Sequence, residues 1–127
     1  MPSRRDFNQM LLVVIGHVVL LSWSLRLVAP PENISLMWLP DGFLLGCLVL
    51  LPMRLWPWVV GLIALVTFGY ETIFTDRPGG MISGFLVANM IASVGGAVVV
   101  RGFCGGRDGF TAYRHLAIFL LLCILAL

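Results

Sequence analysis

Long apolar runs separated by short polar segments make up most of this chain. The pattern predicts four membrane-spanning helices, at about residues 10–28, 39–53, 55–74 and 81–100, and a fifth run that covers residues 115–127. The second helix is short, because the rise of 1.5 Å per residue gives it a length of only about 22 Å against a hydrocarbon core of ~30 Å. We therefore expect residues 34–38 also to lie at membrane depth, in a non-helical conformation shielded by neighbouring helices. The predicted fold class is an all-α integral membrane protein.

The composition excludes a soluble domain and gives no sign of catalysis. Of the 127 residues, 60% are hydrophobic and 11% are charged, whereas a soluble domain has about a quarter charged residues. The three cysteines are far apart and there are two histidines, so neither a zinc site nor a disulfide framework is indicated. No nucleophile–base pair, carboxylate dyad or phosphate-binding loop is recognisable. We expect no catalytic residue, no metal, no cofactor and no nucleic-acid partner.

The arginines predict the orientation in the bilayer. With the N-terminus inside, the inner segments hold six arginines and the outer ones two, which satisfies the positive-inside rule. The six are Arg4, Arg5, Arg54, Arg101, Arg107 and Arg114, and the two are Arg26 and Arg77. Residues 3–7 also resemble a twin-arginine export signal, but the apolar run that follows has a membrane-spanning length and no Ala-x-Ala cleavage site. We therefore predict a multi-pass protein of a bacterial inner membrane with a cytoplasmic N-terminus.

Several ionisable or polar residues fall inside the predicted helices. Arg26, Asp41 and Glu71 lie at similar depth near the outer ends, and such groups are costly in a bilayer unless they are paired or hydrated. We expect Arg26 to pair with Asp41 or Glu71, either as a place where a signal or small ligand is sensed or as a salt bridge that fixes helix packing. His17 and Asn89 fall near the middle of their helices, where they could hydrogen-bond across the bundle. His17 could instead be a packing residue or respond to pH.

Small residues recur every fourth position along the fourth helix. Gly84, Ala88, Ala92 and Gly96 form one smooth stripe. Because such stripes let helices approach closely in lipid, we predict that this face packs against another helix.

Aromatic residues and prolines mark both ends of the second helix. The chain reads Trp38-Leu39-Pro40-Asp41-Gly42 at its start, and Trp56-Pro57 opens the next helix. Tryptophan is enriched at membrane interfaces, and Pro40 and Asp41 suit the first turn of a helix.

These motifs resemble the membrane-associated sensor domain, MASE type one, of bacterial sensor histidine kinases and cyclic-di-GMP enzymes. The resemblance covers about residues 34–100 and includes an asparagine followed by small residues, Asn89, Ala92, Ser93, Gly95 and Gly96. Leu39 stands where the family has its first proline, and Asp41 occupies a variable position. The first helix and its loop look closer to the hexose-phosphate sensor kinase branch, which implies a small anionic ligand.

The resemblance implies a signal-input domain in a two-component or related signal-transduction system. Family members carry about eight membrane spans followed by a kinase, cyclase or phosphodiesterase module, so any enzyme activity would lie in that module. Because the final apolar run stops in mid-span, we expect a fragment whose remaining spans and output module follow Leu127, with a second copy or another membrane protein as partner. We predict that Arg26, Trp38, Pro40, Asp41, Glu71, His17 and Asn89 take part in sensing. A transporter fragment, which would also contain a short, proline-broken helix with a carboxylate, and a stand-alone helical scaffold are the alternatives.

Overall fold

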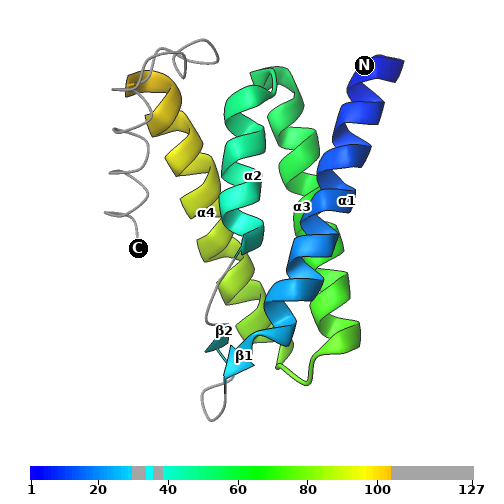
Figure 1. Ribbon diagram of the computed structural model, residues 1–127, viewed down its shortest axis with the longest axis vertical. Coiled ribbons are helices and arrows are strands. Elements are labelled where there is room, and N and C mark those ends of the chain that lie inside the picture. The colour runs from blue at the N-terminus through cyan, green and yellow to red at the C-terminus, as the bar shows by residue number, and fades with distance from the viewer. Residues whose placement is uncertain (30–33, 36–38, 104–127) are drawn as a thin grey trace.

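Four helices lie side by side in the computed structural model, which describes residues 1–29, 34–35 and 39–103 (Figure 1). They are α1 (Arg4–Arg26), α2 (Leu39–Leu50), α3 (Trp56–Phe74) and α4 (Gly79–Phe103), with a 3-10 turn, η1 (Met53–Leu55), before α3. Helices α1 and α4, and η1 together with α3, are long and apolar enough to cross a membrane, whereas α2 is apolar but short. The helical fold class is confirmed for this part of the chain. That α2 also crosses the bilayer stays a prediction, and the predicted fifth helix lies outside the described residues.

Helix α1 begins six residues before the predicted membrane span because its first turn is polar. The Ser3 side chain accepts a hydrogen bond from the Asp6 amide at 3.2 Å, and the Asp6 carboxylate accepts one from the Ser3 amide at 2.8 Å. This reciprocal capping box satisfies two amides that have no partner within the helix. An apolar run locates the membrane-crossing part of a helix but not its polar first turns.

Helix α2 is even shorter than predicted. It begins at Leu39, so that Pro40 and Asp41 occupy its first turn as expected. It ends at Leu50, three residues before the predicted end, because Pro52 lacks an amide donor and disfavours helical geometry in the residue before it. Twelve residues give a length of about 18 Å.

Two short strands between α1 and α2 were not predicted. Strands β1 (Val28–Ala29) and β2 (Ile34–Ser35) pair antiparallel, with Val28 opposite Ser35 and Ala29 opposite Ile34. The expectation of a non-helical approach to α2 is therefore met at residues 34–35. Strands of two residues carry too little periodicity to be recognised in a sequence.

Helix α2 lies within the bundle, packed against both α1 and α4, while α3 contacts α1 and α4. Its buried side chains Leu44 and Leu48 join a core that includes Val59 and Ile63 of α3. Two glycines permit the closest approaches to α2. A Cβ atom on Gly16 of α1 would lie 2.6 Å from the Phe43 ring, and one on Gly96 of α4 would lie 2.6 Å from the Leu45 side chain.

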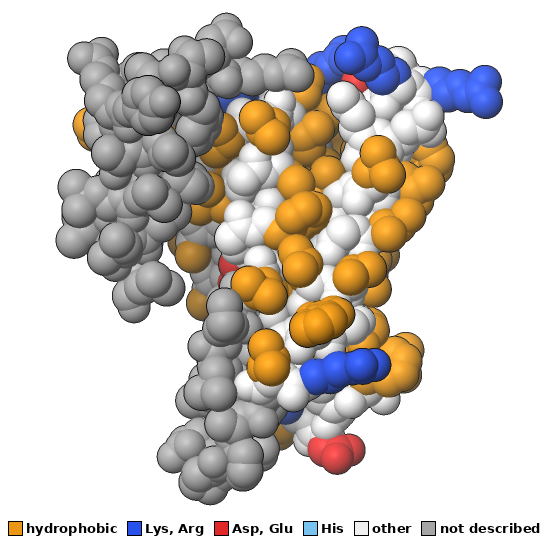
Figure 2. Space-filling view, viewed as in Figure 1, with side chains coloured by type: hydrophobic (Ala, Val, Ile, Leu, Met, Phe, Trp, Pro, Cys, Tyr) orange, Lys and Arg blue, Asp and Glu red, His pale blue; other side chains and the backbone are white. Residues whose placement is uncertain are grey.

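The outer surface of the bundle is apolar. Large hydrophobic side chains are exposed along α1, α3 and α4 and cover much of the face in Figure 2. They include Leu12, Trp23, Leu65, Ile73, Phe85, Val87 and Ile91. An apolar surface of this extent marks a membrane contact rather than one with water, which agrees with the three long apolar helices.

The described arginines lie at the two ends of the bundle. The start of α1, the turn between α2 and α3 and the end of α4 meet at one end, which therefore holds Arg4, Arg5, Arg54 and Arg101 (Figure 1). Arg26 and Arg77 lie toward the other end. The predicted orientation depends on this separation of the arginines. Which end of the bundle lies in the cytoplasm stays a prediction.

Candidate functional site

A buried hydrogen bond joins the middle of α1 to α3. His17 is 1% exposed, and its Nε2 lies 3.1 Å from the hydroxyl oxygen of Thr67. The predicted partner of His17 was Asn89, which lies half-buried on α4 instead. The other ring nitrogen of His17, Nδ1, is buried and has no hydrogen-bond partner among the described residues. His17 thus packs between helices and contacts a hydroxyl of α3.

One to two turns further along α1, two serines also make contacts with other helices. The Ser22 hydroxyl donates to the Val18 carbonyl at 2.8 Å and lies within hydrogen-bonding distance, 2.9 Å, of the Tyr70 hydroxyl on α3. The side chain of Ser24 is buried, and its oxygen accepts a hydrogen bond from the Leu39 amide at 3.2 Å. Ser24 therefore satisfies an amide in the first turn of α2 from a different helix.

The same turn of α2 is held from the opposite side by α4. The buried Ser93 hydroxyl donates to the backbone carbonyl of Asp41 at 3.3 Å. Pro40 is fully buried between these contacts, and Asp41 is half-buried. We call Ser24, Pro40, Asp41 and Ser93 the α2-entry site, since they fix where the short helix begins.

The buried carboxylate of Glu71 is paired, but with a residue other than the predicted one. Its Oε2 lies 3.2 Å from Nη1 of Arg77, and both side chains are largely buried. Arg26, the predicted partner, is exposed at the end of α1. The pairing with Arg77 is local, because Arg77 lies only six residues after Glu71, just past the last helical hydrogen bond of α3, from the Thr75 amide to the Glu71 carbonyl at 2.9 Å. Arg77 thus neutralises a carboxylate that would otherwise be costly to bury.

At the other end of the bundle, polar contacts close the C-terminus of α2. The Leu51 carbonyl accepts hydrogen bonds from the Trp56 indole at 3.3 Å and from Arg101 at 3.2 Å. The Arg101 guanidinium also lies over the Trp56 ring, 5.5 Å from its centroid. A cation beside a helix C-terminus is favourable. Arg101 therefore links the end of α4 to the residue that follows α2 and to the first residue of α3.

The other predicted functional residues are not brought together. Trp38 lies outside the described residues. Of the predicted packing stripe, Gly96 contacts α2, whereas Gly84, Ala88 and Ala92 are exposed within the described part of the chain. The residues of α4 that are buried lie on a different face, at Ile82, Ser93, Ala97 and Val100. A packing role for the rest of the stripe stays a prediction.

Sequence reasoning missed the hydroxyl groups that make the interhelical contacts. Thr67 and Ser93 are each a single small polar residue within an apolar run, and Ser24 lies between Ser22 and Arg26. Small polar residues occur in membrane helices for several reasons. The available signal was their position on the same helical face as large apolar residues. Thr67, for example, follows Val59 and Ile63 at helical spacing.

Among the described residues, no group of three or more histidine, cysteine, aspartate or glutamate side chains could hold a metal ion. The contacts position helices, and those at the start of α2 come from both α1 and α4. Comparison with known proteins gave no matching family model, no similar curated protein and no similar solved structure.

Proposed function

We propose that the chain is the membrane-embedded signal-input domain of a bacterial signal-transduction protein. The observation that carries the proposal is the α2-entry site, where a short helix begins within the bundle and is held by hydroxyl groups of two other helices. Because Ser24 and Ser93 belong to α1 and α4, a relative shift of those helices changes the hydrogen bonds at the start of α2. The resemblance of residues 34–100 to the MASE type one sensor domain supports the same function.

The proposed signal acts at the end of the bundle that holds Arg26 and Glu71. A small anionic ligand would meet the exposed Arg26 guanidinium there, while the Glu71 carboxylate is already neutralised by Arg77. The ligand changes the output only if it binds two packings of the helices with different affinity. The change in packing would then pass to an output module beyond Leu127 in the cytoplasm.

The test measures signalling by the protein as its source DNA encodes it. The reading frame downstream of Leu127 is read first, and a kinase or cyclase module after further membrane spans would support the proposal. Ser93→Ala, which removes the α4 hydroxyl from the α2-entry site, is then compared with Leu50→Ala, which truncates an exposed side chain of α2. We expect the Ser93 variant to lose most of the signal and the Leu50 variant to retain it. Equal signalling at equal expression would contradict the proposal, as would a stop codon directly after Leu127.

A transporter fragment is the second candidate function. A short helix with a carboxylate in its first turn, beginning within the bundle, is also typical of substrate sites in transporters. In that case the downstream sequence would repeat the pattern of residues 38–58 in inverted topology, without a signalling module.

A further inference from the structure

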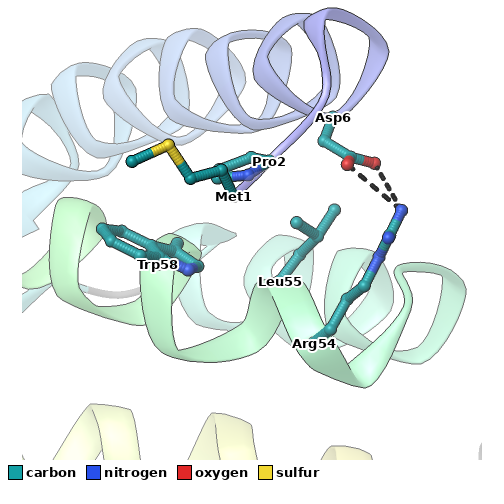
Figure 3. A pocket seen from close by; sticks show the side chains of 6 residues that line it. All are labelled: Met1, Pro2, Asp6, Arg54, Leu55 and Trp58. Carbon is teal, nitrogen blue, oxygen red and sulfur yellow. Dashed lines mark hydrogen bonds and ion pairs between the residues drawn. The ribbon is translucent and has the colours of Figure 1, made fainter.

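A pocket of about 370 Å³ opens between the first residues of the chain and the beginning of α3. Figure 3 shows Asp6 and Arg54 joined on one side of it, with Met1 and Trp58 on the other. The lining residues are Met1, Pro2, Asp6, Arg54, Leu55 and Trp58. Because it adjoins the capped start of α1, the pocket lies at the opposite end of α1 from Arg26.

Within the described part of the chain, Arg54 has hydrogen-bond donors that contact no other group. A single nitrogen, Nη2, donates to both oxygens of Asp6, at 3.0 and 3.1 Å. A guanidinium carries five N–H groups, so Nη1 and Nε can still bind an acceptor. The Arg54 side chain is 68% exposed, whereas that of Asp6 is 6% exposed. The cation therefore faces the surroundings, and the carboxylate faces the protein.

The orientation of Asp6 limits its repulsion of an anion. Both of its oxygens accept from Arg54, and Oδ2 also accepts from the Ser3 amide at 2.8 Å. The first turn of α1 adds two exposed arginines, Arg4 and Arg5. Three guanidinium groups against one carboxylate leave the surroundings of the pocket positively charged.

The remaining walls of the pocket are apolar. Leu55 is almost fully buried, and Trp58 is 58% exposed at the start of a helix long enough to cross a membrane. An exposed tryptophan at the end of such a helix suits the depth of lipid headgroups. The pocket thus places a guanidinium beside an apolar surface at the level where a phospholipid has a phosphate beside acyl chains.

We propose that this pocket binds the headgroup of an anionic glycerophospholipid. The phosphate accepts hydrogen bonds from the free N–H groups of Arg54, because a guanidinium matches phosphate geometry. The glycerol and first methylenes lie against Trp58 and Met1. Basic pockets between membrane helices bind such headgroups by the same combination of contacts.

The test uses the purified full chain in detergent, with native mass spectrometry to measure bound palmitoyl-oleoyl phosphatidylglycerol and phosphatidylcholine. We expect the wild-type chain to retain phosphatidylglycerol in preference to phosphatidylcholine. Arg54→Gln should lower this preference about fivefold, which is the contribution of one basic side chain near an anionic bilayer surface. Retention of phosphatidylcholine, whose headgroup has no net charge, should change less in the same variant, which controls for a general loss of lipid binding.

Asp6→Asn separates lipid binding from a purely structural role of the ion pair. Both Asp6→Asn and Arg54→Gln break the pair, so a structural effect would change lipid retention in the same direction. If Arg54 binds the lipid, the two variants should change the retention of phosphatidylglycerol in opposite directions. Removal of the Asp6 charge leaves the Arg54 guanidinium entirely to the phosphate and should increase the retention. A several-fold increase for Asp6→Asn together with the decrease for Arg54→Gln supports the proposal. Equal retention of the two lipids by the wild-type chain, or a decrease in both variants, would overturn it.

Discussion

The contact between Gly16 and Phe43 allows a quantitative test of how closely α1 and α2 pack. In Gly16→Ala, the new Cβ atom would lie 2.6 Å from Cζ of Phe43 and 3.1 Å from Cε1. Carbon atoms in contact prefer about 3.5–4.0 Å, so the ring or the helices must move by about 1 Å. Overpacking of this kind costs about 1–3 kcal/mol, against a gain in helix propensity of about 1 kcal/mol.

Gly61→Ala is the matched control, since Gly61 is exposed on α3 and a Cβ there would meet no atom within 4 Å. Both variants gain the same helix propensity, so the difference between them isolates the steric cost. We expect Gly16→Ala to be about 1–3 kcal/mol less stable than Gly61→Ala. The measurement is reversible unfolding in mixed micelles with increasing sodium dodecyl sulfate, followed by far-ultraviolet circular dichroism.

A shorter side chain at position 43 should restore the lost stability. Phe43→Leu in the Gly16→Ala background removes the ring that the new methyl group meets, so the two substitutions should cost less together than the sum of their separate effects. Free energies of unfolding for Gly16→Ala and Gly61→Ala that agree within about 0.5 kcal/mol would refute the close approach.

Two further contacts make predictions that the same unfolding measurement can check. His17→Ala and Thr67→Ala should show a coupling energy of about 0.6–1.7 kcal/mol in a double-mutant cycle, the range for interhelical hydrogen bonds in membranes, and additive effects would exclude the bond. Arg101→Met should lower the free energy of unfolding by about 1.5–3 kcal/mol, because the Leu51 carbonyl loses a charged donor. Arg26→Met, on an exposed residue, should change it by no more than about 0.5 kcal/mol, and equal effects of the two substitutions would contradict the role of Arg101.

The long helices can be predicted from the sequence because membrane-spanning length and apolar composition are strong signals. The predicted spans 55–74 and 81–100 agree closely with α3 and α4. The end of α2 was wrong by three residues, although Pro52 marks it. Proline gives the position of a helix end more reliably than hydropathy does, since it removes a backbone donor.

The partners of the buried polar groups could not be predicted, because they depend on how the helices rotate against each other. Glu71 and Arg26 are near in predicted depth, yet Glu71 binds Arg77, six residues away in the sequence. The contact between His17 and Thr67 also depends on helix rotation, because both residues lie on the faces where α1 and α3 contact each other. The depth of a side chain in the membrane follows from its position along a predicted helix. The neighbour that the side chain faces depends on how the helices pack.

The shortness of α2 has a consequence for how the chain enters a bilayer. A 12-residue helix spans about 18 Å, so it gains too little burial in lipid to cross the bilayer as an independent segment. Ser24, which precedes α2, accepts from the amide of its first residue, Leu39. Trp56 and Arg101, which follow it, both donate to the carbonyl of Leu51 just after its last residue. A crossing of the bilayer by α2, as predicted from the sequence, would therefore depend on the contacts that α1, α3 and α4 make with it.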